Sequence, residues 1–234
     1  MSSHPENRVA VVTGAAGGIG AAVAARLAAD GFAVAGADVA QGAAFSCDVR
    51  SEVDVRRLRD EVTARLGAPW LLVNVAGVFF EHRITELAEE DWDLILDTNL
   101  KGTFLTCKTF LPAMIEGGSG CIVNVGSTAG IRGGHTRAAY CAAKAGVVNL
   151  TRSLALDHGG DGVRISCVCP GLIDTPMADW ITSRPDALRE FEEGLPAGRI
   201  GTGGDIAGAV SFLASDAASY THGTVLVVDG GVTA

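Results

Sequence analysis

A chain of 234 residues, 48% of them hydrophobic, is long enough to bury a large core, and single α/β domains commonly reach this length. Its net charge of −9 excludes the densely basic surface that nucleic-acid binding requires. No run of about 18 apolar residues is present to span a membrane, and the polar start at residues 1–7 lacks the order of a signal peptide, so we expect a cytoplasmic protein.

Strand-like and helix-like segments alternate along the chain. In chain order the pattern predicts a strand at 8–13, a helix at 18–30, strands at 33–37 and 43–47, a helix at 52–66, a strand at 70–74, a long helix at 91–114, a strand at 120–125, a helix at 140–158, a strand at 164–169, an irregular or weakly helical stretch at 175–196, a helix at 205–215 and a last strand at 225–228. This alternation, without a linker, predicts one α/β domain over residues 1–234 with a doubly wound parallel sheet flanked by helices.

A glycine-rich turn, Thr-Gly-Ala-Ala-Gly-Gly-Ile-Gly at residues 13–20, joins the first predicted strand to the first predicted helix. Glycines let the backbone turn tightly and approach a pyrophosphate, whose charge is stabilised at a helix N-terminus. Such a turn can also be a bare strand–helix junction. Its place between a strand and a helix favours dinucleotide binding.

Asp38 lies at the end of the second predicted strand, 18 residues after Gly20. An acid at this place accepts hydrogen bonds from the adenosine ribose and repels the additional phosphate of NADP. The neighbours Ala37, Val39 and Ala40 provide no cation for that phosphate. Although a strand-end Asp can simply cap a turn, the pattern favours NAD as the cofactor.

Tyr140 and Lys144 lie four residues apart, on one face of a predicted helix. A free tyrosine has a pKa of about 10, too high for a base at neutral pH, and a fixed cation nearby lowers it. The spacing is common on helices, so the pair is weak evidence alone. Ser127 follows a predicted strand and could hold a substrate oxygen, or could only cap a helix or turn.

The six cysteines contain no CxxC pair, and Cys167 and Cys169 lie two residues apart in a strand-like run. This arrangement suits neither a disulfide framework nor a zinc site. We therefore expect free thiols and no bound metal.

In this order, the motifs resemble those of the classical short-chain dehydrogenases/reductases, over nearly the whole chain from about residue 8 to residue 231. The resemblance is carried by the TGxxxGxG turn at 13–20, Asp48, Asn74-Val-Ala-Gly77, Asn99, Ser127, the YxxxK pair Tyr140/Lys144, and Pro170-Gly-Leu-Ile-Asp-Thr175. It implies a single-domain Rossmann-type fold and an NAD(H)-dependent oxidoreductase that transfers a hydride reversibly between a secondary alcohol and a ketone. Members are commonly homotetramers or homodimers.

The resemblance also implies roles for individual residues. Tyr140 would be the acid/base, Ser127 would orient the substrate oxygen, and Lys144 would lower the pKa of Tyr140 and bind the nicotinamide ribose. Asn99 would hold a water between Lys144 and solvent, although an Asn inside a helix can also bond to the nearby backbone. The implied cofactor-binding residues are Gly14, Gly17, Gly18, Ile19, Gly20, Asp38, Asp48, Val49, Asn74, Ala76, Gly77, Tyr140, Lys144, Pro170, Gly171, Ile173 and Thr175.

Two features depart from the usual pattern of the family. Val75 replaces the second amide of the NNAG motif, which we expect to alter packing and not activity. Only nine residues separate Asp38 from Asp48, which leaves little room for a helix. This resembles the shortened connection of 2,3-dihydro-2,3-dihydroxybenzoate dehydrogenases and certain acyl-carrier-protein ketoreductases.

The sequence leaves the substrate open. The pocket is expected to form from residues 78–82, 126–137 and 175–196, where aromatic and aliphatic side chains favour an apolar or ring-bearing substrate: Phe79, Phe80, Trp180, Ile181 and Phe191. Arg132 and Arg137 could receive a carboxylate. The alternative hypotheses are an NADP(H)-dependent 3-oxoacyl or carbonyl reductase, and a non-catalytic dinucleotide-sensing protein of the same fold.

Overall fold

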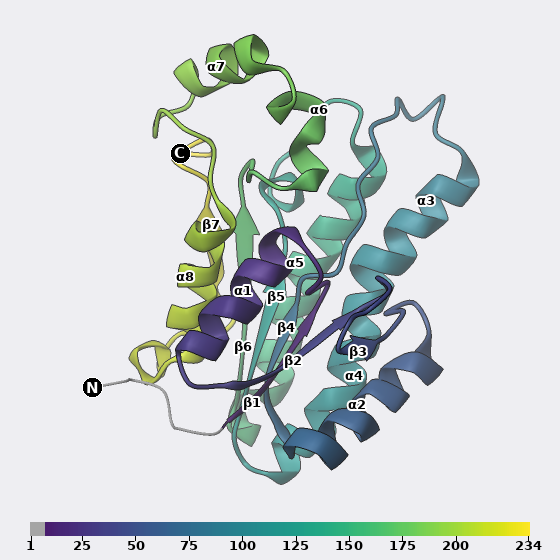
Figure 1. The fold of residues 1–234 in the computed structure, drawn as a ribbon, viewed down its shortest axis with the longest axis vertical. Helices are drawn as coiled ribbons and strands as arrows, with labels where there is room; N and C mark the ends of the chain where they lie inside the picture. Colours follow the sequence, from purple (N-terminus) through teal and green to yellow (C-terminus); the bar gives the residue numbers. More distant parts are fainter. Residues whose placement is uncertain (1–7) are drawn as a thin grey trace.

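A single parallel β-sheet forms the centre of the protein in the computed structural model, which describes residues 8–234 (Figure 1). The start of the chain, where we expect no signal peptide, lies outside the described residues. The sheet has seven strands in the order β3-β2-β1-β4-β5-β6-β7. They are β1 (Val9–Thr13), β2 (Ala33–Asp38), β3 (Phe45–Ser46), β4 (Pro69–Asn74), β5 (Gly120–Val125), β6 (Val163–Pro170) and β7 (Val225–Val228).

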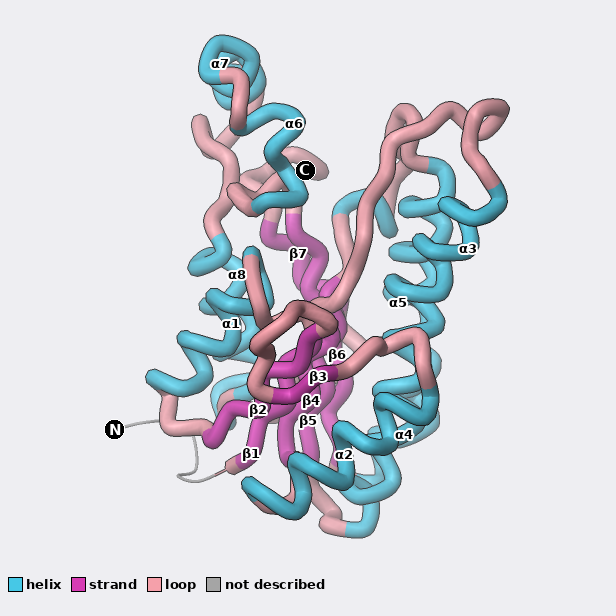
Figure 2. The backbone as a smooth tube through the Cα atoms, turned by 45° about the vertical axis from the view of Figure 1, so that its right-hand side comes forward, coloured by secondary structure: helices cyan, strands magenta, loops and turns pink. Residues whose placement is uncertain are grey.

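Helices cover both faces of this sheet, as Figure 2 shows. One face packs against α1 (Gly18–Ala29) and α8 (Gly203–Ala214) through an apolar cluster that includes Val12, Leu27 and Ile206. The opposite face packs against α2 (Glu52–Leu66), α4 (Gly102–Glu116) and α5 (Ala138–His158). A parallel sheet buried on both faces explains why its strands are continuously apolar. The doubly wound Rossmann-type fold is confirmed.

The strand order reverses beside β1, which pairs with β2 on one side and with β4 on the other. The connections that follow neighbouring strands on the two sides of this point therefore run in opposite directions. They leave a crevice between them at the carboxyl ends of the strands. Ligands of open α/β sheets bind at such a point. This edge carries the glycine turn after β1 and Asp38 at the end of β2.

Two segments differ from their predicted form, and a third agrees with it. The short strand expected at 43–47 is reduced to the two residues of β3. The long helix expected at 91–114 is α3 (Glu89–Leu96), a π-helical turn at Asp97–Lys101 and then α4, because the hydrogen-bond register changes inside it. The stretch expected to be irregular or weakly helical contains α6 (Asp179–Thr182) and α7 (Pro185–Glu193). Pro185 suits the first turn of α7, where an amide hydrogen is not needed.

All six cysteines belong to the described chain and are free thiols, five of them buried. Within residues 8–234, no helix is both long and apolar enough to cross a bilayer.

Candidate active site

A cleft of about 830 Å³ opens at the carboxyl edge of the sheet and extends beneath α6 and α7. Almost all the site residues expected from the sequence line it. They are Gly14, Gly17, Gly18, Ile19, Gly20, Asp38, Asp48, Val49, Ala76, Gly77, Asn99, Ser127, Tyr140, Lys144, Pro170, Gly171, Ile173 and Thr175. The one expected residue that does not line the cleft is Asn74.

The side chain of Asn74 faces the protein interior, so a contact of this side chain with the cofactor is not supported by the geometry. Its Nδ2 donates to Oδ1 of Asn124 at 2.8 Å, and its Oδ1 accepts from the hydroxyl of Thr106 at 2.7 Å. A buried amide needs such partners, and it finds them between β4, β5 and α4. The next residue, Val75, packs against an apolar cluster, as the substitution at this position led us to expect.

The glycine turn is closely packed at two positions and open at a third. Gly14 has a φ of +69°, and a Cβ there would lie 2.9 Å from Cα of Ala76. A Cβ on Gly20 would collide with the carbonyl oxygen of Gly14, whereas a Cβ on Gly17 would meet no atom within 4 Å. No side chain of residues 8–234 caps the N-terminus of α1 at Gly17. Room beside a helix N-terminus with free amides fits the pyrophosphate of a dinucleotide.

The hydroxyl of Thr13 connects the two strands on either side of the crevice. Its oxygen accepts hydrogen bonds from the amides of Val75 at 3.1 Å and Ala76 at 3.2 Å. The end of β1 therefore fixes the backbone that leaves β4, beside the glycine turn. Thr13 belongs to the turn motif, but a role in holding the neighbouring strand end was not foreseen.

Asp38 lies at the far end of the cleft from Tyr140 and Lys144. Its Oδ2 accepts from the amide of Ala16 and its Oδ1 from the amide of Ala40, both at 2.9 Å. The carboxylate thus caps a turn and lines the cleft as well. Asp48 binds Arg50 through two guanidinium nitrogens, and these hydrogen bonds lower the pKa of Asp48.

Tyr140 and Lys144 lie on one face of α5, next to Ser127, which follows β5. The hydroxyl of Ser127 accepts from the amide of Ala129 at 3.1 Å, and its side chain acts on Tyr140 to lower the pKa of the phenol. Lys144 is buried, and its Nζ donates to the carbonyl of Val125 at 2.8 Å while lying 5.7 Å from the centre of the Tyr140 ring. The fold therefore brings the three groups together.

The pKa values differ from the expectation that Lys144 lowers the pKa of Tyr140. Burial raises the pKa of Tyr140 to about 12, against the opposing effects of the Ser127 hydrogen bond and the Arg137 charge. Burial also lowers the pKa of Lys144 to about 8. Desolvation of the phenol thus outweighs the charges around it in the protein by itself, and the lowering of this pKa by Lys144 stays a prediction.

Asn99 lies in the π-helical turn between α3 and α4. Its Nδ2 donates to the carbonyls of Ile95 and Val78, both at 2.9 Å, so the alternative of a backbone-bound amide is confirmed. Its Oδ1 is buried and has no hydrogen-bond partner within residues 8–234. A Cβ on Gly77 would lie 2.5 Å from this oxygen and 3.7 Å from Nζ of Lys144. Asn99 therefore presents a free acceptor beside the lysine. π-Helical turns are frequent at functional sites.

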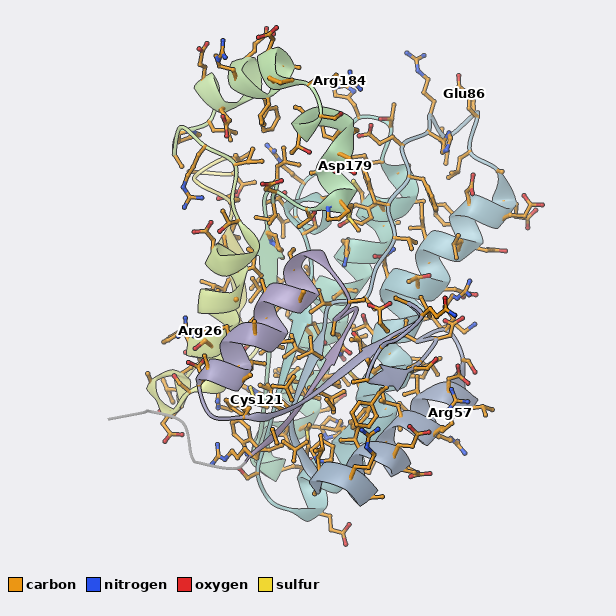
Figure 3. The ribbon with its side chains drawn as sticks, viewed as in Figure 1. Arg26, Arg57, Glu86, Cys121, Asp179 and Arg184 are labelled. Carbon is orange, nitrogen blue, oxygen red and sulfur yellow. The ribbon has the colours of Figure 1, made fainter. Side chains whose placement is uncertain are left out.

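The segment after β6 closes the cleft from above. The side chain of Thr175 lies close to the glycine turn, because a Cβ on Gly18 would be 3.2 Å from its Cγ2. Ile173 is held by a short bridge to Gly201. The chain then continues into α6 and α7. Figure 3 shows Asp179, at the start of α6, and Arg184, just before α7, above the sheet edge.

The substrate end of the cleft agrees only partly with the expected pocket. Phe79, Trp180 and Phe191 line it, but Phe80 is an exposed side chain and Ile181 is buried outside the cleft. Arg132 and Arg137 also line it. Glu81, which pairs with Arg137, was not foreseen, because 56 residues separate the partners and no local pattern joins them.

Known proteins share this architecture over almost the whole chain. The family model described as Enoyl-(Acyl carrier protein) reductase matches residues 14–233. Meso-2,3-butanediol dehydrogenase of Serratia marcescens is 40% identical, with 98% of this chain and 96% of the relative covered. D-threitol dehydrogenase of Mycolicibacterium smegmatis is also 40% identical, with 97% and 94% covered. A Beutenbergia cavernae protein solved with NADP at low occupancy superposes with a TM-score of 0.91, at 34% identity and 99% and 98% coverage.

Proposed function

Because the chain belongs to the short-chain dehydrogenase/reductase family and is an oxidoreductase, we propose that it transfers a hydride reversibly between NAD(H) and a secondary alcohol or ketone. The observation that carries the proposal is the grouping of Tyr140, Ser127 and Lys144 in a cleft whose other end holds the glycine turn and Asp38. The two diol and polyol dehydrogenases at 40% identity support an alcohol as the substrate.

Each of the grouped side chains has a proposed task. Tyr140 takes the hydroxyl proton during oxidation and returns it during reduction, and Ser127 donates a hydrogen bond to the reacting oxygen. Lys144 binds the nicotinamide ribose, and the free acceptor of Asn99 holds a water that connects Lys144 to solvent. The bound dinucleotide supplies or accepts the hydride.

The experiment that tests the proposal is a screen of NAD⁺ reduction over secondary alcohols, diols and polyols, with the reverse reaction on the matching ketones. We expect NADH to form with at least one alcohol class. Binding of NADH without turnover on any substrate would favour the non-catalytic alternative.

The preference for NAD is proposed from the charges at the adenosine end. Asp38 places a carboxylate at this end. Arg50 also lines the cleft, but its guanidinium is bound by Asp48. The additional phosphate of NADP would therefore meet the negative charge of Asp38 without a free cation to bind it. The NADP-dependent reductase remains the alternative, since a protein of the same fold has been solved with NADP.

We expect Asp38→Asn to raise kcat/KM for NADPH relative to NADH by about tenfold or more, because it removes the repulsion of two close charges. Asn keeps the shape and one carbonyl oxygen for the amides of Ala16 and Ala40. Initial rates with both cofactors measure the ratio. Asp60→Asn, on an exposed α2 position, is the matched charge control. An unchanged ratio, or a wild-type enzyme faster with NADPH, would contradict the assignment to NAD.

The rate of alcohol oxidation should increase with pH. Only the phenolate of Tyr140 can accept the proton, and with a pKa raised to about 12 by burial, its population grows up to tenfold per pH unit across the neutral range. The increase should weaken above about pH 8, where Lys144 loses its proton. Ketone reduction needs the protonated phenol and should not increase. A pH series of kcat/KM in both directions checks this, and an oxidation rate that falls between pH 6 and 8 would refute it.

A further inference from the structure

The guanidinium of Arg137 occupies the substrate end of the cleft, between two aromatic rings. Its Cζ lies 5.3 Å from the centre of the Phe79 ring and 5.6 Å from that of Trp180. Phe79 in turn packs edge-to-face on Tyr140, with ring centres 5.0 Å apart. A substrate whose hydroxyl reaches Tyr140 therefore has Arg137 as a neighbour.

The charge of Arg137 is neutralised by a carboxylate on this chain, that of Glu81. Its Nε and Nη2 bind Oε1 of Glu81 at 2.8 and 2.6 Å, and each side chain is 34% exposed. Arg137 lines the cleft, whereas Glu81 is not among the residues that line it. The carboxylate thus neutralises the guanidinium without contacting the space in which a substrate would lie.

The other two arginines at this end are compensated as well. Arg199 binds both carboxylate oxygens of Asp205 at 2.8 and 2.9 Å. Arg132 donates to the carbonyl of Val232 at 3.4 Å. Hydrogen bonds from Thr233 and Gly231 lower the pKa of Asp229 against the effect of burial, and the charge of Arg132 adds to this lowering. Arg137 and Arg199 therefore each bind a carboxylate of this chain, and Arg132 has Asp229 as an acidic neighbour.

The backbone holds the Glu81–Arg137 pair in place. The amide of His82, next to Glu81, donates to the carbonyl of Thr136 at 2.8 Å, and His82 and Arg137 form a short parallel bridge. Thr136 is the one non-glycine residue within residues 8–234 that has a positive φ, +58°. A β-branched residue adopts this conformation only when its surroundings fix it. The segments that carry Glu81 and Arg137 are thus connected by main-chain hydrogen bonding as well as by the side-chain ion pair.

We propose that Glu81 is a specificity-determining residue: by neutralising Arg137, it makes the enzyme select neutral hydroxy compounds over substrates that carry a carboxylate or sulfonate. The inference rests on the proposed function, since it names the substrate class of the same site. An anion in the cleft would have to compete with Glu81 for the guanidinium, or lose its hydration without a free cation to bind. A neutral hydroxyl or amide has no such cost.

The test measures binding of two compounds of the same shape and different charge, cyclohexanecarboxylate and cyclohexanecarboxamide. Each is titrated calorimetrically into enzyme saturated with NADH, for the wild type and for Glu81→Gln. We expect the wild type to prefer the amide. Glu81→Gln keeps the side-chain length and exposes the charge of Arg137, so the affinity ratio of carboxylate to carboxamide should increase about tenfold.

Two further variants separate this effect from a general loss of structure. Glu86→Gln removes the same charge from an exposed position on the loop between β4 and α3 (Figure 3) and should leave the ratio unchanged. Adding Arg137→Gln to Glu81→Gln should cancel the increase, because the gain depends on the guanidinium. The inference would be overturned if the ratio in Glu81→Gln stayed within twofold of the wild type, or if that variant bound no measurable carboxylate. It would also be overturned if the increase survived the loss of Arg137.

The outcome is independent of the test of the proposed function. Charge selectivity is measured as binding, without turnover. If NADH forms from alcohols while the ratio stays unchanged, the oxidoreductase proposal stands and the role of Glu81 fails.

Discussion

Tyr140→Phe should lower kcat for alcohol oxidation about 10³-fold, because a positioned acid/base group contributes on the order of 10²- to 10⁴-fold. The substitution removes one oxygen and keeps the ring that packs on Phe79. The hydroxyl of Ser127 still accepts from the amide of Ala129, so the position of Ser127 should be kept. The rate is measured as NADH formation on the best alcohol from the screen.

The second tyrosine of the chain provides the matched control. Tyr220 is fully exposed, so Tyr220→Phe removes the same atom far from the cleft and should leave kcat within twofold of the wild type. NADH affinity of Tyr140→Phe, followed by nucleotide fluorescence, should remain close to that of the wild type. Equal oxidation rates for Tyr140→Phe and the wild type would refute the assigned role.

Gly20→Ala should lower the free energy of unfolding by about 3 kcal/mol, the upper end of what overpacking typically costs. The new methyl group would collide with the carbonyl oxygen of Gly14, a backbone atom that cannot move without opening the turn. For a chain of this size the melting temperature should fall by roughly 6–12 °C. Thermal unfolding followed by circular dichroism measures the change.

Gly17→Ala is the matched comparison within the same turn. Its Cβ meets no atom within 4 Å, and its φ of −163° suits any residue, so the melting temperature should stay within about 2 °C of the wild type. The methyl group would enter the space proposed for the pyrophosphate, so NADH affinity should fall. Destabilisation by Gly17→Ala, or normal stability of Gly20→Ala, would contradict this account of the turn.

The positions of Asp38, Ser127 and Tyr140 could be predicted because they depend on local pattern. A parallel sheet brings the carboxyl ends of its strands to one edge, so residues that follow apolar runs meet there. The spacing of Tyr140 and Lys144 is also local, since one helical turn places both side chains on one face. The order of these motifs then identified the family.

The features that could not be predicted depend on contacts between distant segments. Asn74 ends β4 just as Asp38 ends β2, but its amide turns inward because Asn124 and Thr106 are there to bind it. The π-helical turn around Asn99 covers only five residues between two helices, so periodicity predicted one long helix. The pKa of Tyr140 is raised by burial in the tertiary structure. The spacing of two residues on a helix does not show how deeply their side chains are buried.

The order of the strands has a consequence for how the chain acquires its fold during synthesis. From β1 the sheet grows outward in sequence order, through β2 to β3 on one side and through β4 to β7 on the other. Each strand that leaves the ribosome can therefore pair at once with a strand already made, and none has to wait for a later partner. Parallel pairing is slow because its loops are long, and an exposed strand edge invites aggregation. Growth at one new edge at a time shortens that exposure, until β7 covers β6.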